Sequence, residues 1–214
     1  LQFLSRKDLE LAEIYNEKIL NNLKDYRGVF YGSYIKTTEG SLKLIEANCR
    51  FGDPECVLAL CLLKTDLYKL FLSLTNKWDG RRVEIDFSRD ACMGLYMVPP
   101  EYALEDKPAT NTLRNALSIS DRNSNIIMGD VKSNGDSLFT GTSRTLFVFS
   151  KEPELCDCIN NVHNIIKGVN GHLDYRTDIG AEFIEDAYEN CGVSVSRAQE
   201  ALNLIKTDIV STYN

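Results

Sequence analysis

The most informative stretch of this 214-residue chain reads Leu44-Ile45-Glu46-Ala47-Asn48-Cys49-Arg50-Phe51-Gly52-Asp53-Pro54-Glu55. Residues 42–48 predict a strand, and a loop that contains Gly52 follows. Pro54 fits the first turn of a helix, where Glu55 is well placed for the helix dipole. The stretch therefore predicts a strand, a loop and a helix in direct succession.

Two oxygen-bearing side chains, Glu46 and Asn48, lie two residues apart on the expected strand. Because side chains alternate across a strand, both are expected on one face. A carboxylate beside an amide oxygen suits Mg²⁺ or Mn²⁺, which usually complete their coordination with water and nucleotide phosphates. A solvated sheet face is the alternative interpretation of the same pair.

Three charged residues follow the strand. Arg50 offers a planar set of donors for a carboxylate or a phosphate. Asp53 and Glu55 flank Pro54 at a helix start, where free backbone N–H groups favour anions. Two structural alternatives stay open: Arg50 and Asp53 form an ion pair that holds the loop, or Asp53 caps the helix.

The segments around this stretch predict a first lobe of helices packed on an antiparallel hairpin. Ser5 and Asp8 resemble a capping box at the start of a helix, and a turn signal at 37–40 separates the two strands. The expected elements are a helix at 6–24, strands at 29–35 and 42–48, and helices at 54–63 and 66–74.

A change of composition near residue 80 indicates a second, mainly antiparallel β domain with one packed helix. The expected fold class is α+β, with domains at 1–80 and 81–180 and a terminal region at 181–214. The second part should contain strands at 92–98, 125–131 and 145–149, turns at 99–100 and 134–135, and helices at 152–169, 181–188 and 197–210.

The composition is that of an ordinary soluble globular protein, with 43% hydrophobic and 26% charged residues. The formal net charge is -7 and no basic stripe appears, which argues against nucleic acid as a primary partner. No apolar run is long enough to span a bilayer and no signal segment opens the chain. These features predict a cytoplasmic protein without a membrane partner.

The seven cysteines are an odd number and lie mostly in apolar stretches, as buried free thiols do in a reducing compartment. Cys156, Cys158 and His163 are close in sequence, but their spacing matches no standard zinc signature. A helix with packed thiols is therefore favoured over a metal site there.

The run from Ile45 to Glu55 closely resembles the signature of phosphoribosylamine–glycine ligases, which are ATP-grasp enzymes of purine synthesis, and only Ala47 departs from it. Three further segments resemble the same family in the same order. They are Tyr26-Arg27-Gly28-Val29-Phe30-Tyr31-Gly32, Lys64-Thr65-Asp66-Leu67 and Tyr175-Arg176-Thr177-Asp178-Ile179-Gly180. The resemblance implies the C-terminal half of such a ligase, cut out of a longer polypeptide.

The resemblance also implies a reaction, in which ATP phosphorylates glycine and phosphoribosylamine attacks the acyl phosphate to give glycinamide ribonucleotide. By resemblance, Glu46 and Asn48 would be the ligands of Mg²⁺ or Mn²⁺. Arg50 and Asp53 would be the catalytic residues, and Arg50 and Glu55 would help to bind the nucleotide. The family's glycine-rich phosphate loop and N-terminal domain have no counterpart in these residues, so the isolated chain is expected to be inactive without that missing half.

The second domain departs from the family because glycines are lost. The departures are at Met97-Val98-Pro99-Pro100-Glu101-Tyr102, Met128-Gly129-Asp130-Val131 and Gly141-Thr142-Ser143-Arg144-Thr145. Since glycine permits close backbone approach, the losses favour an alternative function as a decayed ligase or a non-catalytic binding or scaffold module. Residues 187–206 are similar to the opening of phosphoribosylformylglycinamidine cyclo-ligase, which implies a fused, multifunctional parent.

Overall fold

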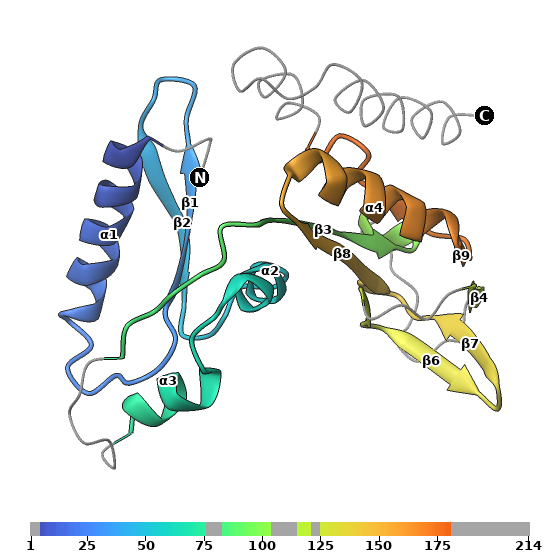
Figure 1. The fold of residues 1–214 in the computed structure, drawn as a ribbon, viewed down its shortest axis with the longest axis horizontal. Helices are drawn as coiled ribbons and strands as arrows, with labels where there is room; N and C mark the ends of the chain where they lie inside the picture. The colour runs from blue at the N-terminus through green and yellow to red at the C-terminus, as the bar shows by residue number, and fades with distance from the viewer. Residues whose placement is uncertain (1–4, 76–82, 104–114, 121–124, 181–214) are drawn as a thin grey trace. The chain divides into compact units, whose positions relative to one another are not determined.

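The computed structural model describes residues 5–75, 83–103, 115–120 and 125–180, which belong to two compact units. Both units combine helices with antiparallel sheets, so the expected α+β class is confirmed in general terms (Figure 1). The helices expected at 181–188 and 197–210 lie outside the described residues, as does the cyclo-ligase-like segment.

The units divide between Phe87 and Ser88, later than the boundary expected near residue 80. Residues 83–87 are tied back to the first unit by hydrogen bonds. The Lys64 N–H donates to the Asp86 carbonyl oxygen at 2.9 Å, and the Asp86 N–H donates to the Thr65 hydroxyl at 2.7 Å. A composition change cannot reveal these contacts because they join residues about twenty positions apart.

The described part of the first unit is a helix on a hairpin, followed by two short helices. Its elements are α1 (Arg6–Leu20), β1 (Tyr31–Lys36), β2 (Leu42–Asn48), α2 (Glu55–Leu62) and α3 (Leu67–Ser73). The predicted capping box is confirmed: the Asp8 N–H donates to the Ser5 hydroxyl and the Ser5 N–H donates to the Asp8 carboxylate. α1 ends earlier than expected because Asn21 caps it and the Asn22 side chain donates to the Lys18 carbonyl oxygen.

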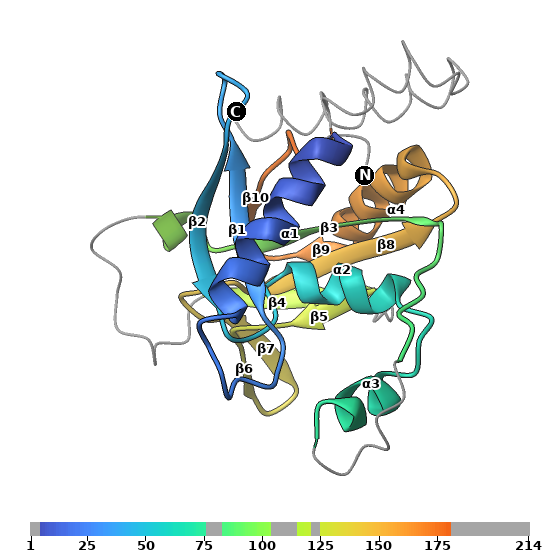
Figure 2. The same cartoon turned by 90° about the vertical axis from the view of Figure 1, so that its left-hand side faces the viewer.

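One face of the hairpin is covered by α1 (Figure 1, Figure 2). Tyr34 of β1 stacks on Tyr15 of α1, and its hydroxyl donates to the Asn16 side chain. At the far end of the strand, the Lys36 ammonium group contacts the Asp8 carboxylate at 2.7 Å. Aromatic packing and an ion pair therefore join α1 to this face.

In its described residues, the second unit contains two four-stranded antiparallel sheets, a helix and a short 3₁₀ turn. The elements are β3 (Ala91–Val98), the 3₁₀ turn η1 (Pro100–Ala103), β4 (Ala116–Ile119), β5 (Ile126–Met128), β6 (Val131–Asn134), β7 (Ser137–Thr140), β8 (Leu146–Glu152), α4 (Leu155–Lys167), β9 (Val169–Asn170) and β10 (Asp174–Tyr175). The strand orders are β10-β3-β8-β5 and β6-β7-β4-β9. The turn expected at 134–135 is confirmed, with Gly135 at a φ of 60° between β6 and β7.

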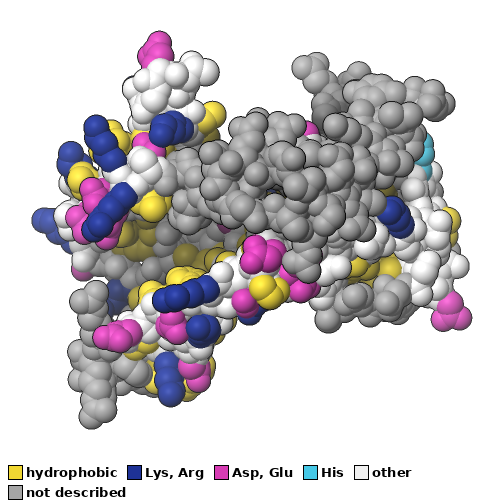
Figure 3. All heavy atoms as spheres, turned by 45° about the horizontal axis from the view of Figure 1, so that its top comes forward, with side chains coloured by type: hydrophobic (Ala, Val, Ile, Leu, Met, Phe, Trp, Pro, Cys, Tyr) yellow, Lys and Arg dark blue, Asp and Glu magenta, His cyan; other side chains and the backbone are white. Residues whose placement is uncertain are grey.

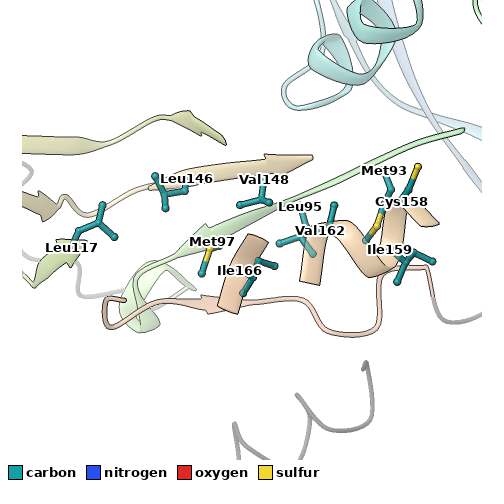
Figure 4. Close-up of a cluster of buried hydrophobic side chains, with 10 residues drawn as sticks. All are labelled: Met93, Leu95, Met97, Leu117, Leu146, Val148, Cys158, Ile159, Val162 and Ile166. Atoms are coloured by element: carbon teal, nitrogen blue, oxygen red, sulfur yellow. The ribbon is translucent and has the colours of Figure 1, made fainter. Parts of the chain in front are cut away.

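The main core lies between α4 and the sheet of β3 and β8 (Figure 4). Cys158, Ile159, Val162 and Ile166 repeat every three or four residues on α4, which gives the helix one apolar face. They pack on side chains of the two strands that alternate toward the helix: Met93, Leu95, Met97, Leu146 and Val148. α4 lies within the helix expected at 152–169.

α4 begins at Leu155, slightly later than expected, because Glu152 still pairs with Ala91 at the end of β8. The strand expected over 125–131 is wrong as one element. β5 ends at Met128, and Gly129 and Asp130 connect it to β6.

Candidate functional site

The side chains of Glu46 and Asn48 lie together at the end of β2. The Asn48 amide nitrogen donates to Glu46 Oε1 at 2.9 Å, and Glu46 is exposed. Both therefore point to one face of the hairpin, as strand alternation predicts. The hydrogen bond uses one Glu46 oxygen and the amide nitrogen, so the second carboxylate oxygen and the Asn48 amide oxygen are the atoms left to bind a cation.

A register shift in the hairpin determines which of its two faces carries Glu46. Ser33 lies opposite Glu46, whereas Tyr34 lies opposite Leu44, so Ile45 has no opposing residue. Opposed residues of an antiparallel pair share a face, and a bulge changes the alternation of the strand that contains it. Leu44 accordingly lies with Tyr34 on the α1 side, while Glu46 lies on the other side. Simple alternation would have put both on one face.

Asn48 and Glu46 share their face with Tyr31 and Ser33, which lie directly opposite them on β1. The Tyr31 phenol also reaches Glu55, in the first turn of α2. Burial raises the pKa of Tyr31, a hydrogen bond with Ser33 lowers it, and the negative charges of Glu55 and Glu46 raise it further, so the net shift is upward. The structure thus brings Glu55 into the same cluster as Glu46.

Sequence reasoning missed Tyr31 and Ser33. Residues of β1 that lie opposite Glu46 could have been sought by pairing the two strands outward from the turn at 37–40. Because of the bulge at Ile45, this pairing is wrong by one residue at Ser33. Only the register shows which residues oppose Glu46.

Arg50 and Asp53 lie exposed in the loop between β2 and α2. The Arg50 guanidinium donates to the Phe51 carbonyl oxygen at 2.8 Å. The helix-cap interpretation of Asp53 is wrong, because Pro54 occupies the N-cap position and no side chain caps this helix. Asp53 instead lies near Cys56, whose thiol pKa is raised by burial and then by the Asp53 charge.

An apolar cavity of about 300 Å³ lies beside the loop within the first unit. Phe51 lines it and meets the Phe71 ring of α3, with 6.3 Å between ring centroids. The other lining residues are Gly28, Val29, Ala59, Leu60, Leu63, Leu67, Leu70, Leu74, Ile85 and Phe87. Phe51 thus anchors the loop on apolar side chains, while the polar residues face outward.

Among the described residues, no group of three or more His, Cys, Asp or Glu side chains is close enough to hold a metal ion. A cation bound by Glu46 and Asn48 would therefore need further oxygen ligands such as phosphates or water, as Mg²⁺ commonly takes. Cys156, Cys158 and His163 are buried on α4, and burial raises the pKa of the Cys158 thiol to about 11.

Sequence comparison relates this chain to curated ligases. It is 31% identical over 191 residues to a phosphoribosylamine–glycine ligase of Methanoregula boonei and 29% identical over 185 residues to one of Methanococcus maripaludis. The chain is related to phosphoribosylamine–glycine ligases. The alignments cover 87% and 84% of the chain but only 43% and 41% of these relatives. No family model matches the sequence.

Solved structures agree on the fold. The phosphoribosylamine–glycine ligase of Thermotoga maritima matches 81% of the chain with a TM-score of 0.63 at 17% identity, and 43% of that structure is covered. The N5-carboxyaminoimidazole ribonucleotide synthetase of the same organism matches with a TM-score of 0.51 at 9% identity. At these identities the likeness concerns the fold alone. None of the helices in the described residues has the length and apolar character needed to cross a membrane.

Proposed function

We propose that this chain supplies part of the active site of an ATP-dependent ligase that joins glycine to phosphoribosylamine to give glycinamide ribonucleotide. The single observation that carries the proposal is the Glu46–Asn48 pair at the end of β2. It lies within a run that resembles the ligase signature, in a chain 31% identical to a protein of that name. A cytoplasmic location is part of the same proposal.

Glu46 and Asn48 are proposed to hold Mg²⁺ or Mn²⁺. Their donor set fits such an ion, because a carboxylate and an amide offer two hard oxygens on one face. When bound, the ion would neutralise charge on the ATP phosphates during transfer to the glycine carboxylate. Arg50 is proposed to orient a phosphate or the glycine carboxylate, Asp53 to shape the loop, and Glu55 to act beside the nucleotide site.

The chain spans less than half the length of the curated relatives it matches, and the remaining site groups are proposed to come from an N-terminal half. The hairpin also exposes apolar side chains, with Ile35 54% and Ile45 61% exposed. Figure 3 shows, on the side of the molecule that it presents, hydrophobic side chains among charged ones. Apolar surface of this kind is suited to cover by another polypeptide segment.

The test is Glu46→Gln in the full-length parent, because this change keeps the side chain's size but removes a charge beside the cation. A cost of ~3 kcal/mol in phosphoryl transfer, roughly a hundredfold in rate, is expected, with only partial rescue by added Mg²⁺. Glu39→Gln, at the hairpin turn, is the matched control and should leave the rate unchanged. Normal activity of Glu46→Gln at limiting Mg²⁺ would show that Glu46 is only a residue of the sheet surface.

A non-catalytic module is the second candidate, and one observation favours it. The Asp130 carboxylate accepts the N–H groups of Thr142 and Ser143 at 2.7 and 3.0 Å, so these amides are already used within the unit. A ligand therefore cannot use them as it could use the backbone of an open glycine-rich turn. If the full-length parent binds Mg-ATP but forms no ADP with glycine and phosphoribosylamine, the module interpretation replaces the ligase.

Fusion to a cyclo-ligase is a separate proposal, based on the resemblance of residues 187–206, which lie outside the described residues. It predicts that the parent also closes the imidazole ring of aminoimidazole ribonucleotide. An assay of the full-length parent with formylglycinamidine ribonucleotide and ATP tests this, and absence of turnover argues against a working cyclo-ligase.

A further inference from the structure

Gly52 is the point where the signature loop contacts the hairpin. The residue is buried, and a Cβ atom at this position would lie 2.7 Å from Glu55 Oε2 and 2.9 Å from Tyr31 Cζ. Contacts this short do not occur for real side chains, so a Cβ here would require the Glu55 carboxylate or the Tyr31 ring to shift. The Tyr31 ring of β1 and the Glu55 carboxylate of α2 therefore both lie close to Gly52.

Backbone hydrogen bonds connect the loop at Gly52 to the first turn of α2. The Cys56 N–H donates to the Gly52 carbonyl oxygen at 3.0 Å, and the Val57 N–H donates to the Pro54 carbonyl oxygen at 2.9 Å. Because no side chain caps α2, these bonds define its first turn. The position of Gly52 consequently sets where Glu55 begins the helix.

Tyr31 is well placed to hold this arrangement. It is half-buried and lies directly opposite Asn48, and its ring and the Glu55 carboxylate both lie close to Gly52. A phenol that stays protonated at neutral pH can donate a hydrogen bond to a carboxylate, and such charge-assisted bonds are stronger than neutral ones.

We propose that Tyr31 is a positioning residue of this site: its ring supports Gly52 and its hydroxyl group orients the Glu55 carboxylate. The loop between β2 and α2 is thereby held in one conformation at the end of the strand that carries Glu46 and Asn48. The role of the held loop in catalysis rests on the proposed function. The packing of Tyr31 against the loop does not.

The first test is amide hydrogen exchange on the 214-residue chain without nucleotide. Tyr31→Phe keeps the ring and removes the hydroxyl group, so exchange at Cys56 and Val57 should become roughly three- to tenfold faster. Tyr34→Phe is the matched control, because it removes a hydroxyl from the same strand on the α1 side. It should affect α1 and leave Cys56 and Val57 unchanged. Unchanged exchange at these two amides in Tyr31→Phe would overturn the proposal.

A double-mutant cycle tests whether Tyr31 acts through Glu55. Once Glu55→Ala has removed the carboxylate, Tyr31→Phe should have little further effect on exchange at Cys56 and Val57. Fully additive effects would mean that the hydroxyl group does not act on Glu55, and would overturn the proposed role.

The kinetics of the full-length parent can separate a positioning role of Tyr31 from general destabilisation. Tyr31→Phe should lower kcat roughly three- to tenfold while KM for ATP stays within about twofold, and Tyr34→Phe should change neither. An unchanged kcat in a parent that is active, and that loses activity in Glu46→Gln, would overturn the positioning role alone. A parent without ligase activity would instead overturn the proposed function, while the exchange results would still decide the role of Tyr31 in holding the loop.

Discussion

Asp130 shows how one residue can build a connection that its neighbours in sequence do not suggest. Its carboxylate accepts two backbone N–H groups, from Thr142 and Ser143, and contacts the Lys132 ammonium group at 3.1 Å. Burial would raise the pKa of Asp130, but the hydrogen bonds from Thr142, Lys132 and Ser143 outweigh it and leave the pKa below its usual value. The carboxylate thus stays charged and joins the connection between β5 and β6 to residues 142–143, which follow β7.

Replacing Asp130 with alanine should destabilise the second unit. The part-buried N–H of Thr142 and the exposed N–H of Ser143 would lose their acceptor, so a loss of about 1–3 kcal/mol in the free energy of unfolding is expected. Urea denaturation measures it, with Asp136→Ala as the control. Asp136 is exposed at the β6–β7 turn, and its replacement should cost less than about 0.5 kcal/mol. Equal effects of the two changes would contradict this account.

At the scale of elements, α1 is held on the hairpin partly by a charge pair that responds to pH. Hydrogen bonds from Lys36 and Ser5 lower the pKa of Asp8 to about 2, from 3.8. Because the folded-state pKa lies below the unfolded one, this stabilisation is complete above about pH 4 and is lost as pH falls toward 2.

Asp8→Asn should therefore make the first unit less dependent on pH in this window. The stability of the wild-type chain should fall more steeply between pH 4.5 and 2.5 than that of the variant, because the variant has no carboxylate to protonate. Circular dichroism monitored during urea unfolding at several pH values provides the comparison. An equal fall in stability with pH in the two proteins would show that the Asp8–Lys36 pair contributes little to the free energy of unfolding.

The packing of α4 on its sheet gives the second element-scale prediction. Ile159 is fully buried in the main core, so Ile159→Ala should cost about 2–5 kcal/mol through lost burial and the cavity left behind. Ile127, on β5, is 42% exposed, and Ile127→Ala should cost clearly less. Thermal unfolding of the two variants checks the order, and a larger loss at Ile127 would contradict the assignment of the core.

At the scale of the whole molecule, the described residues offer proposed nucleotide-site ligands from only one side, the exposed face of the β1–β2 hairpin. The proposed ligands come from one strand, whereas phosphoryl transfer depends on groups that clamp the nucleotide from both sides. The isolated chain should therefore bind Mg-ATP weakly and form no glycinamide ribonucleotide. Calorimetry provides the measurement, and micromolar affinity for Mg-ATP would contradict the half-site proposal.

The sequence by itself determined the local elements and the residues of interest. The capping box at Ser5, the strand at 42–48 and the helix within 152–169 depend on neighbours a few positions apart, and each was predicted. The position of Glu46 and Asn48 on one face follows from strand alternation alone. The relation to ligases likewise comes from the order of residues.

Only the tertiary structure decided which surfaces these residues share. The bulge at Ile45 placed Leu44 with α1 and Glu46 on the opposite face, beside Tyr31. The division of the units after Phe87 and the turn at Asp130 likewise depend on partners that are distant in sequence. The physical reason is the same in each case. Strand register and hydrogen bonds to the backbone join residues that are far apart in sequence, and no local sequence pattern specifies those pairs.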